Sequence, residues 1–140
     1  MNLAAIVEHS STSVVLRVGL YHSSTGQGLT GLTHNSSGLI ISTITDNEAS
    51  ATAESVAGTD DIEDISVLGT YAAPTSGKVR FKEVDATNHK GLYEIQLADA
   101  RFAVSSAKTL FISITGATNL LDATTGYHWT ALQLLISPPR

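Results

Sequence analysis

Two alternating segments on either side of a turn, within residues 79–97, constrain the fold of this chain more than any other feature. In the first segment one face carries Val79, Phe81 and Glu83. In the second segment one face carries Tyr93, Ile95 and Leu97, and the other carries Leu92, Glu94 and Gln96. Alternation with a period of two on both sides of a turn predicts an antiparallel pair of half-buried β-strands.

Similar segments recur along the chain and predict an all-β protein. Strands are expected over residues 14–21, 39–45, 62–68, 109–115 and 127–136, in addition to the pair above. Residues 46–61 fit either a helical turn or a strand of small residues. One short helical turn is expected after Asp99 as its cap, with Ala100, Phe102 and Ala103 turned inward. Seven or eight short strands with at most one or two helical turns predict an antiparallel sandwich of two sheets.

The strands belong to a single domain, which we place at residues 14–136. Residues 1–13 are expected to form either a first strand or an arm that docks on a neighbour. Residues 137–140 contain two consecutive prolines, which cannot continue a sheet, and are expected to leave as an extended tail. The glycine-rich loop over residues 23–37 is expected to be pinned to the domain by Leu29 and Leu32.

Composition excludes several classes of function. The net charge is −5 and no cluster of Lys or Arg is present, whereas a nucleic-acid-binding surface needs a basic patch. No stretch approaches the roughly 20 apolar residues of a membrane helix. The chain contains no cysteine, which excludes disulfides and thiolate metal sites. We expect a soluble protein made in a cytoplasm, with no nucleic-acid or membrane partner.

No catalytic, cofactor-binding or metal-binding residues are predicted. The five histidines lack the spacing of metal ligands on one strand or helix. Hard cations such as calcium bind several oxygen ligands, but the carboxylates of residues 60–64 lack the glycine-bearing loop of an EF-hand. A solvated loop is therefore favoured over a calcium site. Residues 85–88 are expected to form an Asx turn. The sequence contains neither a Gly-x-Ser-x-Gly elbow nor a phosphate loop.

Two sets of residues are candidates for binding. The last strand is apolar on both faces, which indicates a central strand or one covered by a partner subunit. We therefore expect subunit or partner contacts at Leu3, Ile6, Val7, Leu132, Leu134 and Ile136.

Flat aromatic rings can stack on sugars, although core or subunit packing is the commoner use of such rings. The candidates for sugar stacking are Tyr71, Tyr127 and Trp129.

Three motifs carry a resemblance to a known family. They are STGQGLTGLT at residues 24–33, FKEVDATNHKGLYEIQLADA at residues 81–100, and ITGATN at residues 114–119. Together they resemble a family of small β-sandwich modules from tailed bacteriophages and marine viral metagenomes, over most of residues 14–119. The layout is also similar to immunoglobulin-like, prealbumin-like or jelly-roll-like sandwiches. This chain departs from the family pattern at residues 120–127, which are inserted before the last strand.

The resemblance implies a function as well as a fold. It implies a non-enzymatic structural protein of the virion of a tailed phage, with a head decoration protein or a fibre-type subunit favoured. Such a protein would form homo-oligomers, for which a trimer is one option, and would dock on major capsid or tail proteins. The alternatives are a tail or baseplate adaptor and a carbohydrate-binding module for host attachment.

Overall fold

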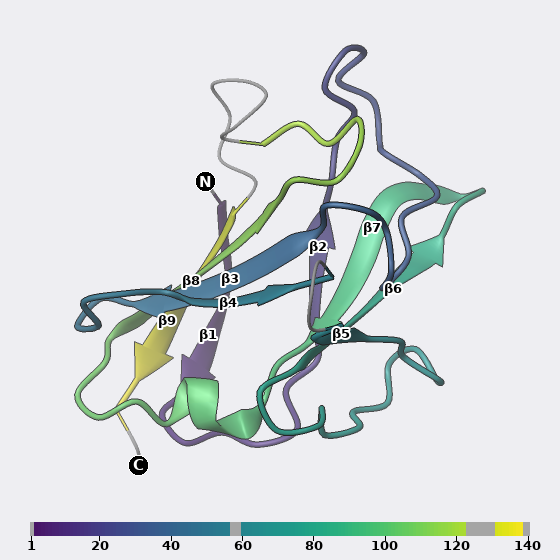
Figure 1. The fold of residues 1–140 in the computed structure, drawn as a ribbon. Helices are drawn as coiled ribbons and strands as arrows, with labels where there is room; N and C mark the ends of the chain where they lie inside the picture. Colours follow the sequence, from purple (N-terminus) through teal and green to yellow (C-terminus); the bar gives the residue numbers. More distant parts are fainter. Residues whose placement is uncertain (1, 57–59, 123–130, 139–140) are drawn as a thin grey trace.

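The computed structural model describes residues 2–56, 60–122 and 131–138 of the chain. In these residues, nine strands and one 3₁₀ helix form two packed layers (Figure 1). The elements are β1 (Asn2–Glu8), β2 (Leu16–Gly19), β3 (Ile40–Thr45), β4 (Thr52–Ser55), β5 (Ile62–Glu63), β6 (Val79–Asp85), β7 (His89–Gln96), η1 (Asp99–Phe102), β8 (Thr109–Thr115) and β9 (Ala131–Ser137). The predicted two-sheet β-sandwich is confirmed.

The two sheets contain five and four strands. Their orders are β1-β9-β8-β3-β4 and β2-β7-β6-β5, and we call them sheet A and sheet B. Most neighbouring strands are antiparallel, but β1 runs parallel to β9 and β5 runs parallel to β6. The expectation of purely antiparallel sheets therefore needs this correction. Neither parallel pair is joined by a hairpin, so no short turn sets its direction.

The strand boundaries follow the sequence in most places. The strand at residues 109–115 is found as predicted, and the strand at residues 39–45 begins one residue later, at Ile40. The strand predicted over residues 62–68 is wrong beyond Glu63. Residues 1–13 and 46–61, whose structure the sequence left open, contain the strands β1 and β4. The described residues therefore form nine strands.

The core lies between the two sheets. On β8, Leu110, Ile112 and Ile114 are buried. The rings of Phe81 and Tyr93 stack with their centroids 5.0 Å apart. The buried residues of β8 are two positions apart, so they share one face of the strand.

The side chain of Tyr93 also anchors the long loop over residues 23–37. Its hydroxyl donates to the carbonyl oxygen of Leu29 at 2.7 Å and accepts from the amide of Leu32 at 3.3 Å. Both leucines are buried, as predicted. Burial raises the pKa of Tyr93 to about 12, so its proton stays in place as the hydrogen-bond donor at neutral pH.

The helical turn predicted after Asp99 exists, but its cap is different. The residue before η1 is Ala98, and no side chain caps the helix. Asp99 Oδ1 instead accepts from the amide of Ser13 at 2.9 Å, which ties η1 to the segment after β1. Phe102 is buried, whereas Ala100 and Ala103 are exposed. A single 3₁₀ turn has too few residues to bury a whole face.

Candidate functional site

Charged residues are almost absent from the strands of sheet A. Across its five strands the sequence contains only Glu8 and Glu54. The four strands of sheet B, which hold fewer residues in total, contain eight charged residues, namely Arg17, Glu63, Arg80, Lys82, Glu83, Asp85, Lys90 and Glu94. The two sheets therefore present surfaces of different chemistry.

The outer face of sheet A is apolar with interspersed hydroxyl groups. Because alternate residues of β3 and β8 are buried, the remaining ones face outward. These outward residues are Ile40, Ser42, Ile44, Thr109, Phe111, Ser113 and Thr115. Ile44 lies opposite Phe111 in the sheet register. This surface has the composition of a protein contact more than that of a solvated face.

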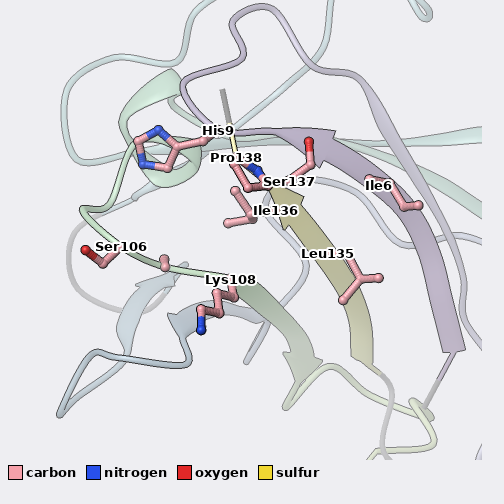
Figure 2. A pocket seen from close by; sticks show the side chains of 9 residues that line it. Ile6, His9, Ser106, Lys108, Leu135, Ile136, Ser137 and Pro138 are labelled. Atoms are coloured by element: carbon pink, nitrogen blue, oxygen red, sulfur yellow. The ribbon is translucent and has the colours of Figure 1, made fainter. Parts of the chain in front are cut away.

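The same face continues onto β1 and β9, where it forms a groove of about 710 Å³. Ile6 and Leu135 are adjacent in register and lie along one side of the groove. Figure 2 shows their side chains, with Ser106 and Lys108 across from them. Ile6 is 68% exposed and Leu135 is 39% exposed. Large aliphatic side chains thus remain in contact with solvent on an otherwise weakly charged face.

The six predicted contact residues divide into three groups. The side chains of Val7, Leu134 and Ile136 are buried within the subunit, although Ile136 also lines the groove. Ile6 does lie on the surface. Leu3 and Leu132 lie on β1 and β9, and their side chains fall outside the described part of the structure.

Leu135 was missed as a contact residue by sequence reasoning. Alternation had placed it on the face opposite Leu134 and Ile136, and that face is the exposed one. The reason for the error is that both faces of β9 are apolar, so the period alone could not identify the core side. Of the two alternatives for this strand, the structure shows the first, a strand with a neighbour on each side, because β9 lies between β1 and β8.

The outer face of sheet B contains a buried carboxylate, Glu94. Arg17 Nε and Nη2 donate to Glu94 Oε1 at 3.1 and 3.0 Å. The amide of Gly69 donates to both carboxylate oxygens, at 2.9 and 3.0 Å. Gln96 Nε2 donates to Oε2 at 2.9 Å. With this many donors around it, the charge is compensated in the way that a buried carboxylate requires.

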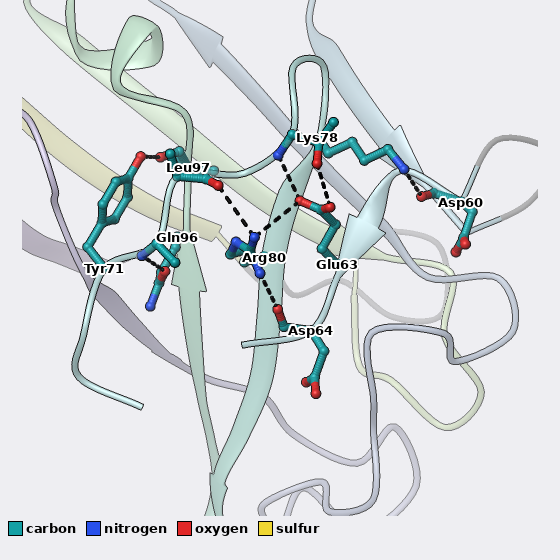
Figure 3. Close-up of polar contacts among 11 residues, drawn as sticks. Asp60, Glu63, Asp64, Tyr71, Lys78, Arg80, Gln96 and Leu97 are labelled. Atoms are coloured by element: carbon teal, nitrogen blue, oxygen red, sulfur yellow. Dashed lines mark hydrogen bonds and ion pairs between the residues drawn. The ribbon is translucent and has the colours of Figure 1, made fainter. Parts of the chain in front are cut away.

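The segment over residues 69–75 covers this face of sheet B. The side-chain amide of Gln96 accepts from the amide of Ala72 at 2.9 Å and donates to the carbonyl oxygen of Thr70 at 3.1 Å. Tyr71 donates its hydroxyl to the carbonyl oxygen of Leu97 at 2.9 Å (Figure 3). Glu94 and Gln96 are both fully buried. The prediction that the strands within residues 79–97 are half buried is therefore wrong for this part of β7, which is buried on both faces.

The carboxylates of residues 60–64 lie beside basic side chains. Arg80 Nη1 donates to the carbonyl oxygen of Asp64 at 2.7 Å, and Lys82 Nζ lies 3.3 Å from Asp64 Oδ1 (Figure 3 shows the Arg80 contacts). Glu63 accepts from the amide and hydroxyl of Thr75 at 2.8 and 2.7 Å. These contacts connect β5, β6 and the covering segment. Within the described ranges, no three His, Asp or Glu side chains are grouped as metal ligands.

The turn at residues 85–88 has the predicted Asx geometry. Asp85 Oδ1 accepts from the amides of Thr87 and Asn88 at 2.9 and 3.0 Å. These amides hold the pKa of the Asp85 carboxyl at about 2. The residues of this motif thus have a structural role in the turn between β6 and β7.

A small polar hollow of about 380 Å³ lies beside the loop that follows β2. Asp64 Oδ1 lies 3.9 Å from His34 Nδ1 on one side and 3.3 Å from Lys82 Nζ on the other. Glu83 accepts from the amide of Gly31 at 3.2 Å. The polar groups that line the hollow are thus bonded to one another or to backbone, and they do not converge on one reacting point.

The sugar-stacking candidates are not brought together in the described residues. Tyr71 lies in the covering segment and is partly buried. Tyr127 and Trp129 fall outside the described residues.

No protein-family model, no curated protein and no solved structure matches this chain. Among the helices that the structure describes, none is long and apolar enough to cross a membrane.

Proposed function

We propose that this chain is a non-enzymatic structural protein that assembles into a larger particle. The sequence resemblance supports the virion of a tailed phage as that particle, with a head decoration protein or fibre-type subunit first and a tail or baseplate adaptor second. The protein acts by burying apolar surface against other subunits.

The observation that carries this proposal is the separation of charge between the two sheets. The outer face of sheet A exposes Ile6 and Leu135 beside a partly exposed Phe111. Exposed apolar side chains gathered on a weakly charged face are typical of contact sites. Because residues 69–75 cover part of the outer face of sheet B, the outer face of sheet A is the one we propose for assembly.

The polar groups of the described residues support a structural role as well. Glu94 and Gln96 are bonded to backbone amides of the covering segment. The Asp85 carboxylate is bonded to its own turn. These two polar clusters therefore have stabilising partners within the fold.

Particle binding tests the proposed function directly. The purified protein is mixed with capsids and, separately, with tails of a phage whose genome encodes this chain, and the particles are sedimented. We expect co-sedimentation with one of the two and saturation at a fixed number of copies per particle. Absence from both pellets would contradict a virion role.

A further inference from the structure

We propose that a second copy of this chain packs on the outer face of sheet A, so that two sandwiches meet face to face about a two-fold axis. This inference rests on the proposal that the protein is an assembling structural subunit, and it names the first partner in that assembly. The contact places β8, the middle strand of the five, near the symmetry axis. Phe111 then lies near the centre of the interface.

The size of the face suits a stable dimer. Five strands about 4.8 Å apart, each with about six residues rising roughly 3.3 Å, span about 24 by 20 Å. Two copies therefore cover roughly 1,000 Å² as a flat projection, which is a lower bound on the accessible area removed. A specific protein interface needs about 1,000 Å² or more.

The chemistry of the face favours an identical partner. A charged partner surface would lose its water against a face that offers it no opposite charge, which is costly. The same face on a second copy brings Ile, Leu and Phe side chains together, and brings the hydroxyls of Thr109, Ser113 and Thr115 within reach of like groups. A two-fold contact is self-complementary, so one weakly charged patch suffices for both sides.

The charged side chains on the outer face of sheet A lie at its edges, away from the centre of the proposed contact. Glu8 lies at the end of β1, and Lys108 immediately precedes β8 and lines the groove. Both belong to the rim of the face, where charges remain in water. An apolar centre with a polar rim is the usual anatomy of a protein interface.

Sedimentation equilibrium of the intact protein over a dilution series tests the inference. The wild-type chain is expected to show the mass of a dimer that dissociates on dilution. Phe111→Glu and Leu135→Glu are each expected to weaken the dimer about tenfold or more, because a charge is then buried without a partner. Circular dichroism and thermal unfolding establish that both variants are folded.

Val67→Glu is the matched control. Val67 is 61% exposed, as an apolar side chain outside sheet A, so the same change of charge is made away from the proposed contact. Its dimer is expected to be as stable as that of the wild type. Equal weakening by Val67→Glu would contradict the assignment of the interface to sheet A.

Cross-linking gives a second readout that does not depend on disturbing the contact. Since the chain contains no cysteine, Ser113→Cys introduces a single thiol on the outer face of β8. A short bismaleimide is expected to join two Ser113→Cys chains and to leave Val67→Cys chains unjoined. The reverse pattern would overturn the proposed geometry.

The outcomes separate this inference from the proposed function. A wild-type monomer that still binds capsids or tails would overturn the dimer and leave the virion role standing, with a virion protein as the occupant of the face. A trimer would also overturn the two-fold contact. A dimer that binds neither particle would support the contact and contradict the virion role.

Discussion

At the scale of single residues, Glu94 shows how a buried charge fixes a segment that has no regular structure. Its carboxylate receives donors from Arg17, Gly69 and Gln96, which come from β2, the covering segment and β7. Removing one member of such a cluster leaves the other buried polar groups without partners. Glu94 therefore holds one end of the covering segment, at Gly69.

We expect Glu94→Gln to destabilise the fold by about 3 kcal/mol, because the Arg17 charge loses its partner and an amide nitrogen faces existing donors. Urea unfolding of the variant measures the loss. Glu63→Gln is the control, since Glu63 also accepts hydrogen bonds from the covering segment but is partly exposed. It is expected to cost about 1 kcal/mol or less. Equal losses in the two variants would show that burial of Glu94 contributes nothing.

Two glycines at the junction of β3 and β8 approach each other closely. Gly38 and Gly116 both have positive φ angles, of 81° and 84°. A Cβ atom on Gly116 would lie 2.2 Å from the carbonyl oxygen of Gly38, and one on Gly38 would lie 2.4 Å from that of Gly116. Backbone atoms cannot move aside as a flexible side chain does, so neither position accepts a side chain.

Gly116→Ala is therefore expected to destabilise the fold more than Gly77→Ala. Gly77 also has a positive φ, of 77°, but a Cβ atom there would meet nothing within 4 Å. Both variants place a side chain at a positive φ angle, which costs roughly 1 kcal/mol. Only Gly116→Ala adds a clash with the backbone. Thermal unfolding midpoints compare them, and equal midpoints would argue against the close approach.

At the scale of elements, Arg101 connects η1 to sheet A. Its Nη1 and Nη2 donate to the two carboxylate oxygens of Glu48 at 3.1 and 2.7 Å, and Nε donates to Thr43 Oγ1 at 2.9 Å. This bidentate geometry holds the turn after β3 against η1. The hydrogen bonds from Arg101 lower the pKa of Glu48 from 4.5 to about 2.

The lowered pKa of Glu48 predicts a loss of stability in acid. Because the folded-state pKa lies below the unfolded value, the stabilisation is complete above pH 4.5 and is lost as the pH falls toward 2. Glu48→Gln should destabilise the protein at pH 7 by about 1 kcal/mol, allowing for solvent screening. Thermal unfolding from pH 6 to 2 should show the two proteins converging. A constant difference across this range would contradict the ion pair.

At the scale of the whole molecule, the two sheets have separate roles. Sheet B, with its charged strands and covering segment, is stabilised by contacts within the subunit. Sheet A presents Ile6, Leu135 and Phe111 outward and is the surface proposed for assembly. The chain thus combines a self-contained layer with a layer suited to a partner.

Much of this architecture could be predicted from local pattern. Alternation predicted the strand over residues 109–115 and that Leu110, Ile112 and Ile114 share one face, which is the buried one. Leu29 and Leu32 were predicted to anchor a glycine-rich loop, and both are buried. The Asx turn followed from the hydrogen-bonding capacity of an Asp two and three residues before the amides it binds. In each case the interacting groups are close in sequence or repeat with the period of the strand.

The candidate site was only partly predictable. Ile6 was identified as a contact residue, but Leu135 was not, and Val7, Leu134 and Ile136 proved to be buried within the subunit. Periodicity identifies which residues share a face, but it does not identify which face meets the other sheet. That choice depends on strands far apart in sequence.

The sequence by itself determined the all-β class, the two-layer arrangement and the residues that alternate toward the core, because a pleated strand directs successive side chains to opposite sides. Tertiary structure alone decided that β1 pairs with β9 in parallel, that Glu94 and Gln96 are covered, and that sheet A keeps a weakly charged face in solvent. Those features arise from contacts between distant segments, for which no local period exists.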